Sequence, residues 1–271
     1  MSNYEFVSIV LTAYNAEATL LQTLNSIKNQ TYKDFELIFI DDGSKDGSLK
    51  IAEDFFKKKE INMKIIHREN KGFLYSSAEG IYNSNGNYIA RIDADDIWEY
   101  NHLYLILKEF KKNDSLVLCG SNAIFVNNVN KIIGKSNLPL KDSEIRKYML
   151  RDNPFIHSSV VFKKEVYNKT CGYLINEECA KLISDYNLFF ELSKNGQCIN
   201  IAEYTVMYRI LENSLSREID KCINYNARLK IMKKVFMFYK KNFLYYFINS
   251  FKVKIKLFYH CTIKKLNLIL I

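Results

Sequence analysis

The sequence predicts an α/β protein whose mixed, mainly parallel sheet is flanked by helices. Over the first hundred residues, short apolar runs alternate with stretches whose apolar residues recur at helical spacing, which is typical of βαβ units. The chain has 271 residues, 48% of them hydrophobic, so it can bury a sizeable core. Polar clusters directly follow three of the apolar runs, at the edge where open α/β sheets bind ligands.

The first half of the chain predicts four strands and three helices in alternation. The continuous apolar runs indicate buried strands, and apolar residues at helical spacing indicate the helices between them. A turn-forming run, Asp41–Ser48, opens the second helix. The predicted strands are Val7–Leu11, Phe35–Ile40, Met63–Ile66 and Tyr88–Ile92, and the predicted helices are Leu20–Ile27, Leu49–Phe56 and Leu74–Tyr82.

The second half predicts a mixed arrangement. A helix is expected at Leu103–Phe110 and a strand at Leu116–Cys119, and Asn127-Asn128 indicates the turn of a hairpin. The hairpin strands are Ala123–Val126 and Lys131–Ile133, and the later elements are a strand at His157–Phe162, a helix at Ser184–Lys194 ended by Gly196, and a strand at Thr205–Tyr208. A C-terminal extension is expected to begin near Arg217.

Composition disfavours several classes of protein. The six cysteines form no C-x-x-C pair and have no histidine at zinc-ligand spacing, which disfavours a metal cage or disulfide framework and favours a reducing cytoplasm. The N-terminus lacks a signal-peptide layout, and no stretch of about 18 uncharged apolar residues exists to cross a bilayer. No G-x-G-x-x-G follows the first strand, which disfavours a NAD-dependent dehydrogenase. We therefore expect a protein that is neither exported nor integral to a membrane.

The positive charge of the chain is confined to its C-terminal extension. Residues 221–271 hold twelve Lys or Arg and no Asp or Glu, so the first 220 residues carry −3 of the net charge of +9. Because these cations are interleaved with aromatic and aliphatic residues, the extension is predicted to bind an anionic membrane surface. The alternative is a set of helices that pack back on the domain with their lysines in water. No nucleic acid is expected as a partner, because the chain has no recognised module for binding one.

Three carboxylates follow the fourth predicted strand within four residues. Asp93, Asp95 and Asp96 repel one another at this density, so they are tolerated mainly where a cation neutralises them. Thr12–Asn15 and Asp41-Asp42 also follow strands directly, and a parallel sheet brings such loops to one edge. The pattern predicts a metal-assisted site for a phosphorylated substrate. The alternative is a solvated acidic turn that caps the next helix.

An ordered series of motifs resembles the family 2 glycosyltransferases, enzymes with the GT-A fold. The series covers residues 5 to about 217, and its order makes it specific although each motif alone is weak. Its first part comprises Val7–Asn15, Gln30–Leu37, Ile40–Ser48, Asn70–Gly72 and Asp93–Asp96, and its second part comprises His157–Val160, Gly172-Tyr173, Ser184–Leu188, Tyr208-Arg209 and Ser214–Ser216.

The resemblance implies an inverting glycosyltransferase that acts in the synthesis of bacterial envelope polysaccharide, such as lipopolysaccharide, O-antigen or capsule. It implies a nucleotide-sugar donor, usually a UDP-sugar, a Mn²⁺ or Mg²⁺ cofactor, and a glycan or polyprenyl-diphosphate-linked acceptor. Residues 1–217 are expected to form the GT-A domain, with a nucleotide-binding half at about 1–100 and an acceptor half at about 101–217. Residues 218–271 are expected to form the basic extension. The implied location is cytoplasmic, peripheral on the inner face of the cell membrane.

The matched positions suggest roles on the donor side of the site. The nucleotide is implied to contact Thr12, Tyr14, Asn15, Asp42, Lys71 and Asp93. The resemblance implies that the ring of Tyr14 lies near the base, that the Asp42 carboxylate accepts an imino N–H, and that Asp93 approaches the ribose. Ordinary packing is the alternative for Tyr14. Asp95 is implied to bind the metal, which bridges the diphosphate oxygens.

Further matched positions suggest roles near the acceptor. Asp185 is implied to be the general base that takes the proton of the acceptor hydroxyl; a dipole-stabilising residue in a first helical turn is the alternative. Asp96, His157 and Arg209 are candidates for donor or acceptor contacts. A helix N-cap is the alternative for Asp96, and a structural imidazole is the alternative for His157.

Two positions depart from the family pattern. Ser76-Ser77-Ala78 stands where members often carry Ala-Arg-Asn, so a cationic donor contact is missing there, and Arg68 or Lys71 is a candidate to replace it. Leu211 stands where a histidine often follows Tyr-Arg, which leaves Arg209 as the nearest candidate for that contact. These departures motivate the alternative of a catalytically degenerate subunit that only binds nucleotide sugars.

A sugar nucleotidyltransferase is a further alternative, because such enzymes also use strands that end in metal-binding aspartates. That class needs an early phosphate loop rich in glycine and basic residues, whereas Thr12–Glu17 contains neither glycine nor lysine. The sequence therefore favours the glycosyltransferase.

Overall fold

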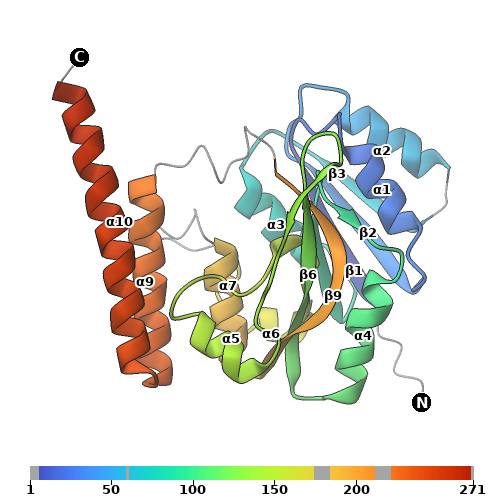
Figure 1. Ribbon diagram of the computed structural model, residues 1–271. Coiled ribbons are helices and arrows are strands. Elements are labelled where there is room, and N and C mark those ends of the chain that lie inside the picture. Colours follow the sequence, from blue (N-terminus) through green and yellow to red (C-terminus); the bar gives the residue numbers. More distant parts are fainter. Residues whose placement is uncertain (1–5, 59–60, 174–183, 211–220, 270–271) are drawn as a thin grey trace.

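The computed structural model describes residues 6–58, 61–173, 184–210 and 221–269. Within these ranges the strands form one nine-stranded sheet in the order β3-β2-β1-β4-β8-β6-β9-β5, with β7 paired to β6. Helices cover both faces of the sheet, and two long C-terminal helices stand at one side (Figure 1). The predicted α/β class, with flanking helices and a helical extension, is confirmed.

The first four strands are parallel and are connected by three helices. The strands are β1 (Val7–Ala13), β2 (Phe35–Asp41), β3 (Met63–His67) and β4 (Tyr88–Asp93), and the helices are α1 (Leu20–Lys28), α2 (Ser48–Lys57) and α3 (Phe73–Tyr82). Every residue of β1 and β2 is buried, as expected for parallel strands covered on both faces. Each element predicted in this half lies within an observed one.

The remaining strands make the sheet mixed. Strand β8 (Val161–Lys163) runs antiparallel to β4 and β6, whereas β9 (Gln197–Arg209) runs parallel to β6. The other elements are β5 (Ile97–Trp98), α4 (His102–Lys112), β6 (Leu116–Val126), β7 (Ile132–Lys135), α5 (Asp142–Tyr148), α6 (Lys164–Tyr167) and α7 (Ser184–Ser193). The predicted strand Thr205–Tyr208 is the end of β9, and α7 ends one residue before the predicted Lys194. The sequence does not predict β5, α5 or α6, because each is too short to show periodicity.

The prediction of separate strands at Leu116–Cys119 and Ala123–Val126 is wrong, because β6 is continuous. The polar residues Ser121 and Asn122 lie between the two predicted strands, yet both are buried. Ser121 Oγ accepts a hydrogen bond from Thr205, and Asn122 Oδ1 accepts one from the Ser136 hydroxyl at 2.7 Å. Polar residues whose hydrogen bonds are satisfied can continue a buried strand.

The prediction of a strand at His157–Phe162 is wrong in its first half. His157–Ser159 form a 3₁₀ turn, and β8 begins only at Val161. The Ser159 hydroxyl donates to the carbonyl of Ile156 at 2.9 Å. Such local side-chain hydrogen bonds offer the backbone an alternative to a sheet ladder.

Two apolar cores lie on opposite faces of the sheet. One joins Leu11 of β1 to Leu24 of α1 and to residues of α2 and α4. The other joins Val10 of β1 to residues of α3, α5 and α7, and it also contains Val235 of the C-terminal extension. Alternate residues of β1 therefore face different layers, as the period of a strand requires.

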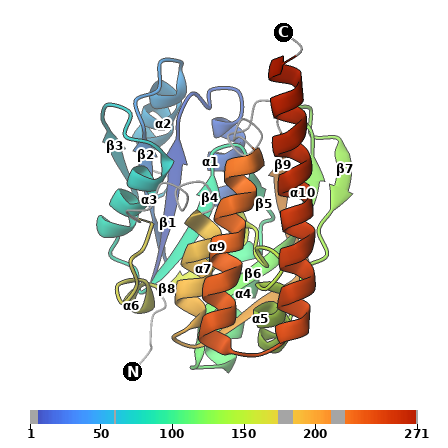
Figure 2. The same ribbon diagram turned by 90° about the vertical axis from the view of Figure 1, so that its left-hand side faces the viewer.

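The C-terminal extension is a hairpin of α9 (Lys221–Tyr239) and α10 (Phe243–Ile269) beside α7 (Figure 2). The Tyr239 hydroxyl accepts a hydrogen bond from Arg146 and lies 2.7 Å from Ser193 Oγ. The rings of Phe236 and Tyr246 stack with centroids 4.5 Å apart and so join α9 to α10. Helix α9 therefore packs against the domain, as the alternative interpretation of the extension predicts. None of the helices in the described ranges is long and apolar enough to cross a membrane.

The contact of Tyr239 with the domain can be tested by removing one hydroxyl. Tyr239→Phe should lower the free energy of unfolding by about 1 kcal/mol, because Arg146 and Ser193 lose a partly buried partner. Urea denaturation followed by circular dichroism measures the change. Tyr246→Phe is the matched control, because its ring keeps the stacking on Phe236. An equal loss in both variants would contradict the role given to Tyr239.

Candidate active site

The carboxyl ends of β1, β2 and β4 bring three polar loops to one edge of the sheet. In the register of these strands, Thr12 lies beside Ile40 and Asp93, and Ala13 lies beside Asp41. The loops after the three strands therefore begin at the same level. This confirms the convergence that the sequence predicts.

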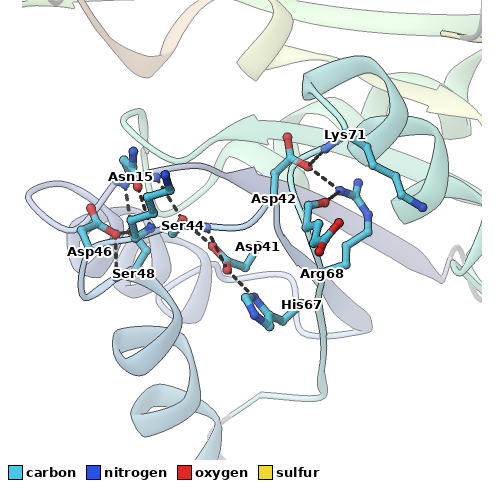
Figure 3. Close-up of polar contacts among 12 residues, drawn as sticks. Asn15, Asp41, Asp42, Ser44, Asp46, Ser48, His67, Arg68 and Lys71 are labelled. Carbon is cyan, nitrogen blue, oxygen red and sulfur yellow. Dashed lines mark hydrogen bonds and ion pairs between the residues drawn. The ribbon is translucent and has the colours of Figure 1, made fainter.

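Figure 3 shows how the loops after β1 and β2 are joined. The buried Asp41 carboxylate accepts the N–H of Ser44 at 3.3 Å and contacts His67 Nδ1 at 2.6 Å. Ser44 Oγ accepts the N–H of Asn15 at 3.0 Å, and Asn15 Oδ1 accepts the N–H of Lys45 at 2.9 Å. Asn15 has a left-handed backbone, with φ of 50°. In the structure Asn15 holds these two loops together, and its contact with a nucleotide stays a prediction.

The Asp42 carboxylate holds a further loop, the one after β3 (Figure 3). Oδ1 accepts the N–H of Lys71 at 2.9 Å, and Oδ2 accepts the N–H of Gly72 at 3.0 Å. Arg68 forms an ion pair with the same carboxylate. A carboxylate has about four acceptor positions, so roughly one remains for the predicted contact with a base.

Lys71, rather than Arg68, has its charge directed to solvent. The Arg68 guanidinium donates to Glu79 at 2.7 Å and to Ser76 Oγ at 2.8 Å, in addition to its pair with Asp42. The Lys71 side chain is exposed, and its ammonium lies 4.7 Å from the centroid of the Tyr75 ring. Of the two candidates for the missing cationic contact, Lys71 is therefore the better placed.

Tyr14 lies on the solvent side of this edge. Its side chain is 50% exposed, so packing in a core does not explain the aromatic ring at this position. Thr12 is buried at the end of β1. An exposed ring next to a polar edge offers a flat surface on which a planar base can stack.

A buried network lies against Asp93. Arg91 is fully buried in β4 and donates to the carbonyl of Val10 at 2.6 Å and to Asp93 Oδ1 at 3.3 Å. His157 Nδ1 lies 3.1 Å from Asp93 Oδ2, and His157 Nε2 lies 2.7 Å from the hydroxyl of Tyr173. Neither Arg91 nor Tyr173 is among the site residues that the sequence predicts. Arg91 could be recognised in the sequence as a cation within an apolar predicted strand, because a buried charge needs a partner.

The network has opposite effects on two carboxyl groups. Burial raises the pKa of Asp93, but His157 and Arg91 outweigh it and lower this pKa to about 2. Burial raises the pKa of Asp185, with His157 acting in the opposite direction. Asn153 Nδ2 donates to Asp185 Oδ2 at 2.8 Å. The structure therefore brings Asp185 near His157 and Asp93, which come from distant parts of the chain.

Asp95 and Asp96 differ in their surroundings. Asp96 is 1% exposed, and its Oδ1 accepts the N–H of Arg209 at 2.8 Å. Helix α4 begins at His102, so the alternative that Asp96 caps a helix is wrong. Burial and the charge of Asp93 raise the pKa of Asp95 to about 6. The carboxylate of Asp95 has no hydrogen bond or ion pair with another residue in the part of the chain that the structure describes.

The Arg209 side chain binds a backbone carbonyl of the acidic loop, residues 93–96. Its Nε donates to the carbonyl of Asp95 at 2.9 Å, its Nη1 to the carbonyl of Asn127 at 3.0 Å, and its Nη2 to Gln22 Oε1 at 3.1 Å. The side chain is buried. Arg209 therefore positions the loop in this structure, and a contact with the donor stays a prediction. Leu211 lies outside the described residues.

The acidic edge fits a divalent cation that takes few protein ligands. Across the described ranges, no group of three or more His, Cys, Asp or Glu side chains is arranged to hold a metal. Asp96 Oδ2 is buried without a hydrogen-bond partner among the described residues, and burial and the charge of Asp95 raise the pKa of Asp96. Mg²⁺ commonly binds through one or two carboxylates and completes its shell with phosphate oxygens and water. The residues present fit an ion bound in this way.

Comparison with known proteins gives the family. The sequence model of glycosyl transferase family 2 matches residues 8–170. The chain belongs to glycosyl transferase family 2. It is 31% identical over 264 residues to an uncharacterized glycosyltransferase of Haemophilus influenzae, across 94% of this chain and 78% of that relative. The resemblance to this family drawn from the sequence is confirmed.

Two further proteins are similar to this family 2 member. The Escherichia coli UDP-Glc:alpha-D-GlcNAc-diphosphoundecaprenol beta-1,3-glucosyltransferase WfgD is 29% identical over 219 residues, across 80% of this chain and 81% of that protein. The crystal structure of S. aureus TarS 1-349 in complex with UDP-GlcNAc has a TM-score of 0.69 at 15% identity. That match covers 85% of this chain and 66% of the TarS chain. It confirms the GT-A fold.

The network at Asp93 predicts that the hydroxyl of Tyr173 contributes to the stability of the fold. Tyr173→Phe should lower the free energy of unfolding by about 1 to 3 kcal/mol, because a buried imidazole nitrogen loses its nearest partner. Tyr75→Phe is the control, since that ring is 39% exposed and keeps its contacts with Arg68 and Lys71. Urea denaturation of both variants measures the difference. A loss no larger than that of the control would remove Tyr173 from the network.

Proposed function

We propose that this protein transfers a sugar, with inversion, from a UDP-sugar to a hydroxyl group of a glycan or polyprenyl-diphosphate-linked acceptor. One observation carries the proposal: Asp185 approaches Asp93 and His157 at the sheet edge that also holds Asp95. A single displacement needs a base on one side of the sugar and charge stabilisation on the other. In this proposal Asp185, from the second half of the chain, supplies the base, and Asp95, from the first half, supplies the charge stabilisation through a bound cation.

Asp185 is the base in this proposal. Burial raises its pKa, which makes the carboxylate a stronger proton acceptor, and His157 opposes the shift and so favours the ionised form. The hydrogen bond from Asn153 holds Oδ2, and the acceptor hydroxyl would approach the carboxylate at Oδ1. In this role Asp185 removes the hydroxyl proton as the oxygen attacks the anomeric carbon.

The donor would occupy the edge formed by the loops after β1, β2 and β4. The exposed ring of Tyr14 would contact the base, Asp93 the ribose, and Lys71 the diphosphate. Mn²⁺ or Mg²⁺, when bound, would supply a Lewis acid that stabilises the charge on the departing nucleotide. Asp95 would hold that ion, because its carboxylate lacks another partner among the described residues.

Two of the similar proteins support the substrate class. TarS was crystallised with UDP-GlcNAc, and the name of WfgD specifies UDP-Glc as donor and a diphosphoundecaprenol-linked sugar as acceptor. Such an acceptor is held in a bilayer. We therefore include peripheral attachment to the inner face of the cell membrane, through the basic extension, in the proposal.

The degenerate binding subunit is the second candidate, motivated by Ser77 and Leu211. Ser77 is fully buried in α3, so the departure at this position lies on a packed face of the helix. The chain retains Asp185, the proposed base, which a subunit that only binds nucleotide sugars does not need. The enzyme is therefore the better supported candidate.

If Asp185 is the base, removing its charge should slow sugar transfer without weakening the binding of UDP. Asp185→Asn should reduce the rate of sugar transfer about 10²- to 10⁴-fold, because no base remains for the acceptor hydroxyl. The affinity for UDP, measured by calorimetry, should stay within about threefold of the original, since Asp185 lies on the acceptor side. Asp54→Asn on α2 is the control, with an exposed carboxylate. Full transfer activity in Asp185→Asn would place the base elsewhere.

The role of Asp95 predicts a loss of metal-dependent nucleotide binding. In Asp95→Asn, the gain in UDP affinity that Mn²⁺ gives the original protein should disappear, because the amide is a poor ligand for a hard cation. Thermal stabilisation by UDP, with and without Mn²⁺, measures this gain. Asp114→Asn, an exposed change before β6, should keep it. Unchanged Mn²⁺ dependence in Asp95→Asn would exclude Asp95 as the ligand.

A further inference from the structure

A basic groove lies between the catalytic part and the C-terminal hairpin, away from the sheet edge described above. Its volume is about 560 Å³. The side chains of the groove that bear on the argument are Arg151, Arg228, Tyr245, Asn249, Lys252 and Lys256. Arg151 belongs to the segment after α5, Arg228 to α9, and the others to α10. The groove contains none of the proposed donor or acceptor residues.

The groove has an excess of positive charge. Arg228 is paired with Asp152 at 2.6 Å and donates to the carbonyl of Arg151 at 2.7 Å, so its own charge is compensated. Arg151, Lys252 and Lys256 are exposed and form no salt bridge in the described part of the chain. Residues 221–271 contain no Asp or Glu. Three cations therefore face a groove with room for an anionic group.

An apolar stripe on α10 borders this groove. The stripe consists of large side chains at spacings of four and three residues, each between 44% and 73% exposed: Leu244, Ile248, Phe251, Ile255 and Phe258. Ile248 and Ile255 also line the groove. At about 1.5 Å per residue the stripe is about 20 Å long, which exceeds the width of one lipid molecule. A surface of this length matches a helix that lies along a bilayer.

We propose that the groove binds the phosphate of an anionic phospholipid while the apolar stripe enters the adjoining acyl region. The charge of the groove complements a phosphodiester, and the stripe places the hydrocarbon next to it. The length of the stripe favours bulk phospholipid over a single carrier lipid. This inference rests on the proposed function for the membrane location and adds a specific headgroup site to it.

The groove also adjoins the segment that holds the proposed base. Arg151 lines the groove, and two residues later Asn153 donates to Asp185. Asp152, between them, is anchored by Arg228 of α9. A headgroup bound at Arg151 therefore lies beside the segment that positions Asp185, so attachment to the bilayer would orient the acceptor side of the site toward a lipid-linked substrate.

The test compares two triple variants of the full chain that remove equal charge. The groove variant carries Arg151→Gln, Lys252→Gln and Lys256→Gln; the control carries Lys230→Gln, Lys233→Gln and Lys234→Gln, which are exposed on α9 outside the groove. Sedimentation measures binding to phosphatidylcholine vesicles with about 25 mol% phosphatidylglycerol, at physiological ionic strength. The groove variant should bind at least about tenfold more weakly than the control.

Three outcomes would overturn the proposal. Equal losses in the two variants would mean diffuse attraction without a site, and equal binding of the original protein to pure phosphatidylcholine would mean that no anionic headgroup is recognised. Binding to neutral vesicles that contain polyprenyl phosphate, without binding to phosphatidylglycerol, would assign the groove to the carrier lipid instead. Circular dichroism spectra and urea denaturation of both variants, matching those of the original protein, show that they are folded. Vesicle binding needs no nucleotide. A failure to bind vesicles would therefore contradict the lipid site and not the proposed sugar transfer. A failure to bind UDP would contradict the proposed sugar transfer and not the lipid site.

Discussion

The buried guanidinium of Arg91 is the constraint on which the geometry of the site depends. An arginine without solvent must find its hydrogen-bond partners within the protein, and here it uses the carbonyl of Val10 and the carboxylate of Asp93. These contacts tie β4 to β1 and fix Asp93 at the carboxyl edge. His157 completes the arrangement, because it contacts Asp93 on one side and Tyr173 on the other. The same imidazole lowers the pKa of Asp185 against the effect of burial, so one buried network acts on carboxyl groups from different parts of the chain.

The loops around this network are held by carboxylates that bind protein groups. Asp41 anchors the loop after β2, and Asp42 anchors the loop after β3 through two backbone N–H groups and Arg68. Such contacts keep an edge of short loops in place before any ligand binds, which lowers the entropic cost of binding. Asp95 contrasts with them, since its carboxylate has no such partner in the described part of the chain and its pKa is raised to about 6. The arrangement separates the carboxylates that hold the loops from Asp95, which holds none through its side chain in the described part of the chain.

The parallel half of the fold could be predicted from the sequence because its strands are continuous apolar runs and its helices show clear periodicity. The second half was harder, since Ser121 and Asn122 suggest a loop although their hydrogen bonds are satisfied within β6. The convergence of Asp93 and Asp95 with the other loops followed from topology alone. The network around Arg91 could not be predicted in detail, because it joins β4 to a 3₁₀ turn and to Tyr173 across more than sixty positions of sequence. Periodicity describes local structure and carries no information about such pairings.

The proposed function requires a nucleotide-sugar site at the carboxyl edge of β1, β2 and β4. A crystal structure of the full chain with UDP and Mn²⁺ would locate that site. We expect the uracil ring against Tyr14, the ribose near Asp93, and the metal between Asp95 and the diphosphate. A nucleotide bound elsewhere, or a metal without contact to Asp95, would contradict this expectation.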